Sequence, residues 1–185
     1  DKTMGMIRVV SGKYRGKKLK RVPGSGTRPI PHKLKEAFFS VIHFDLPGIT
    51  MLDGFAGTGG IGIEALSRGA ERVVFVEQNY TAVKVIRHNL EKCDAQDNAV
   101  VVHKEFNRAV IKLSREEEEF HMIFVDPPYK LLDERDPLKV IYKRGILKEG
   151  GLIALRKHFK TDYEGKYFTF QRRLRVGDDV ILFYK

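Results

Sequence analysis

Between residue 50 and about residue 155, short apolar runs alternate with longer segments in which apolar residues recur every three to four positions. Short apolar runs between turn residues are typical of buried strands, and the three-to-four spacing is typical of amphipathic helices. The runs predict strands at residues 50–52, 72–77, 99–103, 121–125 and 152–155. The spacing predicts helices at residues 61–68, 81–92, 108–118 and 138–147. Strands and helices in strict alternation predict an α/β fold, with a doubly wound and mainly parallel sheet.

The flanking segments add elements of other kinds. Residues 33–43 have helical spacing, and residues 167–174 and 180–184 predict an antiparallel hairpin at one sheet edge, which makes seven strands. At the amino-terminal end, residues 6–28 predict a basic β-hairpin followed by a flexible loop. We therefore divide the chain into residues 1–5, set aside as a candidate expression remnant, the basic hairpin and loop at 6–28, and a main domain at 29–185.

The positive charge is concentrated near the amino terminus. The chain carries a net charge of +10, and residues 1–35 hold eleven Lys and Arg but one acid, whereas the other 150 residues hold 23 of each sign. A localised excess of this kind favours a polyanionic partner, most commonly nucleic acid. A solubilising tail is the alternative, but the β-forming residues between these charges argue against it. The candidate nucleic-acid contacts are Arg8, Lys13, Tyr14, Arg15, Lys17, Lys18 and Arg28, although Tyr14 suits packing equally well.

Composition limits the cellular compartment and the metal binding that we expect. No apolar stretch approaches the roughly 20 residues that span a bilayer, and no secretory signal is visible, so we expect a cytoplasmic protein without membrane contact. The single cysteine, Cys93, cannot form an internal disulfide, which fits a reducing compartment. The six histidines are scattered without metal-ligand spacing, so we expect no metal site. A monomer is the default expectation for the oligomeric state.

A glycine-rich loop follows the first predicted sheet strand. Residues 53–59 read Asp-Gly-Phe-Ala-Gly-Thr-Gly, and the candidate ligand-binding positions in it are Asp53, Phe55, Gly57 and Gly59. Glycines allow close backbone approach, and the helix that follows offers free N–H groups to a pyrophosphate or to an amino-acid carboxylate. The spacing matches neither the dinucleotide fingerprint nor a P-loop.

Acidic residues at two later strand ends extend this candidate site. Glu77 ends the next strand, about 20 residues after the glycines, where a carboxylate can meet ribose hydroxyls. Glu105 follows the third strand and could accept a hydrogen bond from an adenine amine, with Phe106 against the ring.

The tetrapeptide Asp126-Pro127-Pro128-Tyr129 directly follows the apolar run at residues 122–125. Asp126 can accept one N–H of an exocyclic base amine and the Pro127 carbonyl the other, while the rigid prolines hold both acceptors in place. Tyr129 can stack on the base. We therefore take Asp126, Pro127 and Tyr129 as the catalytic candidates for methyl transfer to a base nitrogen.

These stretches resemble the class I (Rossmann-like) S-adenosylmethionine-dependent methyltransferases, and more narrowly the RsmD family of bacterial 16S rRNA guanine-N2 methyltransferases. Residues 10–19, 28–29, 35–39, 62–70 and 177–180 match that family, and the resemblance runs from about Met6 to the end. It implies a methyltransferase domain at 29–185, S-adenosylmethionine as methyl donor, and 16S rRNA, a 30S subunit or an assembly particle as partner. It also implies that Asp53 and Gly57 border the methionine part of the donor, that Glu77 binds its ribose, and that Glu105 and Phe106 bind its adenine.

The chain departs from the family pattern at a few places: Gly54 stands where leucine is usual, Ile30 and His32 replace Thr and Asp, and Arg156 stands where Glu is common. We expect the last three to change the detailed contacts to the acceptor RNA. Two alternatives stay open at this point: a DNA adenine-N6 methyltransferase, which the tetrapeptide permits, and a non-catalytic RNA-binding or ribosome-assembly factor.

Overall fold

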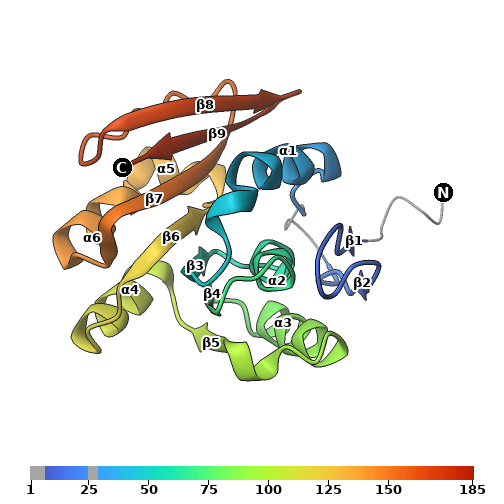
Figure 1. Cartoon of the computed structure of the whole chain (residues 1–185). Helices are drawn as coiled ribbons and strands as arrows, with labels where there is room; N and C mark the ends of the chain where they lie inside the picture. The colour runs from blue at the N-terminus through green and yellow to red at the C-terminus, as the bar shows by residue number, and fades with distance from the viewer. Residues whose placement is uncertain (1–6, 25–28) are drawn as a thin grey trace.

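A seven-stranded sheet forms the centre of the protein, as shown by a computed structural model that describes residues 7–24 and 29–185 (Figure 1). Its strands are β3 (Thr50–Gly54), β4 (Arg72–Glu77), β5 (Ala99–His103), β6 (Phe120–Val125), β7 (Leu147–His158), β8 (Phe170–Val176) and β9 (Asp179–Tyr184). The strand order is β5-β4-β3-β6-β7-β9-β8. The first five strands in this order are parallel, and β9 runs antiparallel to both β7 and β8. The predicted doubly wound, mainly parallel sheet is therefore confirmed.

Helices cover both faces of the sheet (Figure 1). On one face lie α1 (His32–Ile42), α2 (Gly60–Ser67) and α3 (Tyr80–Lys92); on the other lie α4 (Phe106–Arg115) and α6 (Pro137–Arg144). Short connections are α5 (Tyr129–Glu134) and the 3-10 turns η1 (His43–Asp45) and η2 (Gln96–Asn98). Each face has its own apolar core: Phe38 of α1 packs on Phe124 and Phe183 of the sheet, while Ala109 and Leu138 belong to the second core. None of the helices in the described ranges is both long and apolar enough to cross a bilayer.

The strand order reverses between β3 and β6. These strands are parallel neighbours, with Gly54 opposite Val125, but the chain continues from β3 towards β4 and β5 and from β6 towards β7. Ligands of open α/β sheets bind beyond the carboxyl ends of strands at such a reversal. The glycine loop (residues 53–59) follows β3 and the acceptor corner (residues 126–129) follows β6, so the fold brings these two predicted sites to one place.

The amino-terminal hairpin lies against α2 and α3 (Figure 1). Its strands, β1 (Ile7–Arg8) and β2 (Lys18–Leu19), pair antiparallel and are only two residues long. Val9, Tyr14 and Leu19 are buried in the same apolar core as α1 and α2. The hairpin is therefore packed against the main domain through apolar side chains and presents its charges outward.

Several boundaries differ from the sequence expectations. The helix expected at 138–147 ends at Arg144, because Gly145 adopts φ 63° and caps it. Strand β7 runs for twelve residues rather than four, with an irregular register between the pairs at Phe120 and Met122. The helix α5 was not predicted, and the helix expected at 108–118 begins at Phe106 and ends at Arg115.

Candidate active site

The glycine loop is shaped by buried carboxylates. Asp53 is 2% exposed, and its Oδ2 accepts a hydrogen bond from the Gly62 N–H in the first turn of α2, at 3.0 Å. Burial raises the pKa of Asp53 well above its usual value, opposed by that hydrogen bond. Glu77 accepts from the Gly57 N–H at 2.9 Å and from the Asn79 N–H at 2.8 Å. The two carboxylates thus fix the loop to α2 on one side and to the end of β4 on the other.

The glycine loop leaves its backbone open to a ligand at Gly57. Gly57 has φ 57°, and nothing lies within 4 Å of the position where its side chain would begin. The backbone there is open to close approach by a ligand. Each Glu77 oxygen accepts one hydrogen bond from the described residues, and a carboxylate oxygen has two acceptor positions, so capacity remains for hydroxyl groups. These residues fit the methionine and ribose parts of S-adenosylmethionine.

Phe106, which we predict to lie against an adenine ring, is held in place by packing. Phe106 is 3% exposed and stacks on Phe55, with centroids 4.7 Å apart. A side chain at Gly54 would begin 2.7 Å from Phe106 Cε2, so the departure at Gly54 makes room for this ring over β3. Phe106 is therefore a packing residue, and the half-buried Phe55 is the ring of this pair nearer the surface.

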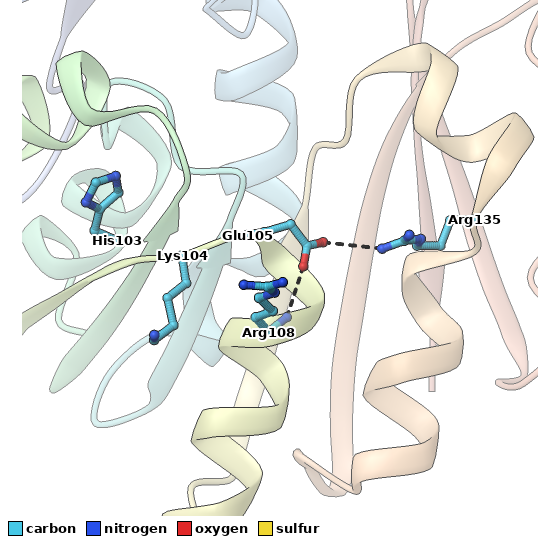
Figure 2. A pocket seen from close by; sticks show the side chains of 5 residues that line it. All are labelled: His103, Lys104, Glu105, Arg108 and Arg135. Atoms are coloured by element: carbon cyan, nitrogen blue, oxygen red, sulfur yellow. Dashed lines mark hydrogen bonds and ion pairs between the residues drawn. The ribbon is translucent and has the colours of Figure 1, made fainter.

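Glu105 lies at the rim of a hollow of about 500 Å³ at the carboxyl end of β5. Its carboxylate caps α4, accepting from the N–H groups of Asn107 and Arg108 at 3.0 and 3.1 Å. Figure 2 shows the same carboxylate reaching towards Arg135, at 3.7 Å, across the hollow. His103 and Lys104 complete the lining. Glu105 thus links α4 to the segment that follows α5, a role the sequence did not reveal, and an adenine amine would have to share its oxygens.

At the acceptor corner, Asp126 and Pro127 lie inward while Tyr129 is 50% exposed. Pro128 is exposed and is the N-cap of α5, and its carbonyl accepts a hydrogen bond from the Leu131 N–H at 2.9 Å. Within the described residues, the Pro127 carbonyl accepts no hydrogen bond, so it is available to a donor from a ligand. The corner therefore presents a carboxylate, a carbonyl and an exposed ring on adjacent residues.

Arg156 is the residue at this corner that the sequence reasoning did not place. Its side chain is 7% exposed, and its Nη1 donates to Asp126 Oδ2 at 3.0 Å. Its Nη2 and Nε donate to Asp179 Oδ1 at 3.2 and 3.3 Å. Burial opposes the charge of Arg156, but Asp126 and Asp179 outweigh it and raise its pKa. Burial also raises the pKa of Asp126, and Arg156 limits the rise. One oxygen of Asp126, Oδ2, is thus held by the arginine, while Oδ1 accepts nothing from the described residues.

The other departures lie near the start of α1. Ile30 packs against the apolar core, and His32 Nε2 lies 3.1 Å from Glu36 Oε1, one turn along the helix. Among the described residues, neither Ile30 nor His32 forms a hydrogen bond or ion pair with the acceptor corner. No group of three or more His, Cys, Asp or Glu is arranged to hold a metal ion within residues 7–24 and 29–185.

The predicted RNA contacts divide into three groups. Arg8, Lys13, Arg15, Lys17 and Lys18 are exposed on the hairpin. Tyr14 is 7% exposed and its N–H donates to Ser67 Oγ at 2.8 Å, so its burial favours packing over stacking on a nucleotide. Arg28 lies outside the described residues.

Buried polar groups hold the hairpin in place. Glu64 is fully buried and accepts from the N–H groups of Val10 and Ser11 at 2.8 and 3.2 Å. It also pairs with Lys35 at 3.3 Å and Arg68 at 3.0 Å. The hairpin is thus tied to the same helix, α2, that begins at the glycine loop.

A sheet of this order, with a glycine loop and an Asp-Pro-Pro-Tyr corner at neighbouring strand ends, has the class I S-adenosylmethionine-dependent methyltransferase fold. Residues 7–185 match the family described as "Conserved hypothetical protein 95". The chain therefore belongs to this family, and the resemblance to RsmD proteins is confirmed.

Individual relatives agree with this assignment. YlbH of Bacillus subtilis, named as a candidate rRNA methyltransferase, is 40% identical over 148 residues, which is 80% of each chain. Ribosomal RNA small subunit methyltransferase D of Escherichia coli K12 is 32% identical over 151 residues, 80% of this chain and 73% of that one. The solved structure of yhhF from Escherichia coli, named as a candidate methyltransferase, superposes with a TM-score of 0.81 at 26% identity and covers 97% of both chains.

Proposed function

We propose that this protein transfers the methyl group of S-adenosylmethionine to the exocyclic N2 of a guanine in small-subunit rRNA. The observation that carries the proposal is the acceptor corner, where Asp126 keeps one carboxylate oxygen available beside the glycine loop. The curated relatives of this family named as small-subunit rRNA methyltransferases support the choice of substrate.

S-adenosylmethionine supplies a methyl group that is already activated by its sulfonium, so the protein has to position and activate the acceptor amine. Asp126 Oδ1 can accept one N–H of the amine and the Pro127 carbonyl the other. These bonds orient the nitrogen lone pair and strengthen as the amine gains positive charge. Asp126 is also placed to accept the proton that the nitrogen loses. Holding the reacting atoms about 3–3.5 Å apart accounts for much of the rate in such a displacement.

The acceptor base must leave its stack to reach the corner. Unstacking costs a few kcal/mol, and phosphate contacts to the exposed cations of the hairpin can offset that cost. The exposed ring of Tyr129 then offers a stacking surface at the corner itself. The proposal therefore assigns binding energy to the hairpin and base orientation to residues 126–129.

The test uses 30S subunits and 16S rRNA from cells that lack the corresponding methylation. The protein is incubated with labelled donor, and the RNA is digested for nucleoside mass spectrometry. We expect N2-methylguanosine to form, and Asp126→Asn and Tyr129→Ala to reduce its rate at least tenfold, about 1.4 kcal/mol in the barrier. Asp133→Asn, which makes the same charge change at an exposed position on α5, serves as the control and should retain the parent rate.

Three other outcomes would contradict the proposed function. Methylation of adenine in duplex DNA in preference to rRNA would identify a DNA methyltransferase. Calorimetry that detects no binding of S-adenosylmethionine would indicate a non-catalytic RNA-binding protein. Equal rates for Asp126→Asn and the parent would exclude the acceptor corner as the site of transfer.

A further inference from the structure

Aromatic and cationic side chains continue beyond the acceptor corner, over the ends of β7 and β8. The Tyr129 ring meets His158 edge-on, with centroids 5.9 Å apart. His158 in turn lies 4.9 Å from the ring of Phe159, and the guanidinium of Arg175 lies 4.3 Å above that ring. Lys160 Nζ is 5.7 Å from the same ring. We call these five residues the aromatic strip.

The aromatic strip lies at the catalytic edge of the sheet. Strand β7 is parallel to β6, with Leu155 opposite Val125, so its end at His158 lies at the same edge as Asp126. Arg175 comes from β8, opposite Val180, which is itself opposite Lys157 at the end of β7. Three strand ends therefore bring the strip together next to the acceptor corner.

Arg175 is held in one orientation while remaining accessible to a ligand. Phe159 supports its guanidinium from below, and its Nε donates to the Gly177 carbonyl at 2.9 Å. The residue is exposed, as is Lys160. Within the part of the chain that the structure describes, neither cation forms an ion pair with a carboxylate. A pre-oriented guanidinium with unused N–H donors suits a phosphate group, and its flat face suits a base.

We propose that the part of the aromatic strip beyond Tyr129 binds the single-stranded RNA nucleotide next to the acceptor, with its phosphate on Arg175 and Lys160 and its base on His158 and Phe159. Cations interleaved with aromatic rings are the usual means of binding single strands without reading sequence. The inference rests on the proposed function, because a flipped-out acceptor leaves its neighbour unpaired beside the corner.

This surface is distinct from the basic hairpin. The hairpin lies against α2 and α3, on the β4 side of the strand-order reversal, whereas the strip lies on the β7 and β8 side (Figure 1). The RNA would thus be held on both sides of the acceptor nucleotide. Contacts from the basic hairpin on one side and the aromatic strip on the other would keep the acceptor base out of its stack, whereas a basic patch on one side alone would not.

The test compares Arg175→Gln with Arg172→Gln. Arg172 is exposed on the same strand but lies opposite Phe183, on the face covered by α1, so the control removes the same charge outside the strip. Binding of each protein to undermethylated 16S rRNA is measured over a range of salt concentrations, and donor binding by calorimetry. We expect Arg175→Gln to weaken RNA binding about tenfold and to reduce the slope of log K against log salt by about 0.7, as for one lost phosphate contact on a single strand.

Phe159→Leu keeps an apolar side chain but removes the flat ring, and it should raise the KM for RNA about fivefold or more if the ring supports stacking. Donor affinity and kcat should stay within about twofold of the parent for both strip variants. If Arg175→Gln and Arg172→Gln have the same RNA affinity and the same salt slope, the aromatic strip has a packing role and does not bind RNA, even if the parent methylates rRNA. A parent that binds RNA but does not methylate it would refute the proposed function instead, and one that binds no RNA would refute both.

Discussion

Replacing Arg156 with glutamine should move the pH dependence of methyl transfer. In the parent, Arg156 donates to Asp126 Oδ2 at 3.0 Å and lowers the cost of ionising that carboxyl, whose pKa burial already raises. Removal of an opposite charge at this distance raises a carboxyl pKa by about 1–3 units. The Asp126 side chain is 27% exposed, so water weakens the effect, and we expect a rise at the lower end of that range.

The sign follows from the state that works in transfer. The ionised carboxylate is the better acceptor for the amine N–H, so activity falls as the pH drops through the pKa of Asp126. The higher pKa of Asp126 in Arg156→Gln therefore shifts the acidic limb of the kcat/KM profile to higher pH. At alkaline pH, where Asp126 is ionised in both proteins, the variant should keep a larger share of the parent rate than at acidic pH. Initial rates of methyl transfer across the mildly acidic to mildly alkaline range measure this shift.

Two further variants make the experiment specific. Arg156→Lys keeps the charge but loses the planar guanidinium that contacts Asp126 and Asp179. Its kcat/KM should therefore fall over the same acidic pH range as in the parent, but with a lower kcat. Arg72→Gln removes another arginine that is paired with a carboxylate, Glu118, at 2.8 Å, far from the acceptor corner, and should change neither. An acidic limb in Arg156→Gln that coincides with the parent's would refute the view that Arg156 positions and ionises Asp126.

Three more predictions concern the frame of the site. Burial raises the pKa of Asp53, so above the usual pKa of an aspartate the folded protein binds more protons than the unfolded chain, and its stability falls as the pH rises through that window. In urea titrations, Asp53→Asn should therefore gain stability relative to the parent as the pH rises, and a constant difference between the two proteins would contradict this. Glu64→Gln removes a fully buried charge that faces two cations, and it should lower the free energy of unfolding by about 3 kcal/mol. Trypsin should then cleave the hairpin faster than in the parent or in Asp45→Asn, a charge change at an exposed residue, and equal cleavage rates would contradict the prediction. Gly54→Ala places a methyl group 2.7 Å from Phe106 and should lower the free energy of unfolding by about 1–3 kcal/mol. In the double variant, Phe106→Leu should relieve part of this loss, and strictly additive losses would argue against the contact.

The sheet could be predicted from the sequence because its central strands are continuous apolar runs. The strand at 72–77 has the predicted bounds, since a buried parallel strand leaves little room for polar residues. The strand at 99–103 also has the predicted bounds, but it lies at the sheet edge and is only partly buried, so its continuous apolar run alone carried the prediction. The missed parts lack that signal. Helix α5 has six residues, too few for a period to show, and the early part of β7 carries Lys148, Glu149 and two glycines that indicate a turn.

The candidate site was predictable in its strand ends but not in its contacts. Asp53, Glu77 and Asp126 follow apolar runs, and the parallel sheet brings such ends to one edge. The link between Asp126 and Arg156 joins residues 30 positions apart, and no local pattern specifies it. The packing of Phe106 over Gly54 was not predictable, because a ring that packs on a strand and a ring that stacks on a ligand have the same residue type.

Apolar packing and polar bonds have different roles in this protein. The two cores fix the layers, but apolar contacts have no direction and tolerate small shifts of one layer against another. Directional bonds set the relative positions of the functional parts: Glu64 ties the hairpin to α2, and Arg156 orients the acceptor carboxylate. Asn89, fully buried, accepts from the Lys20 N–H and donates to the carbonyls of Lys20 and Thr58, so one side chain joins the hairpin to the glycine loop. A shift of the hairpin must therefore either carry the glycine loop with it or break buried hydrogen bonds, because the same amide group serves both segments.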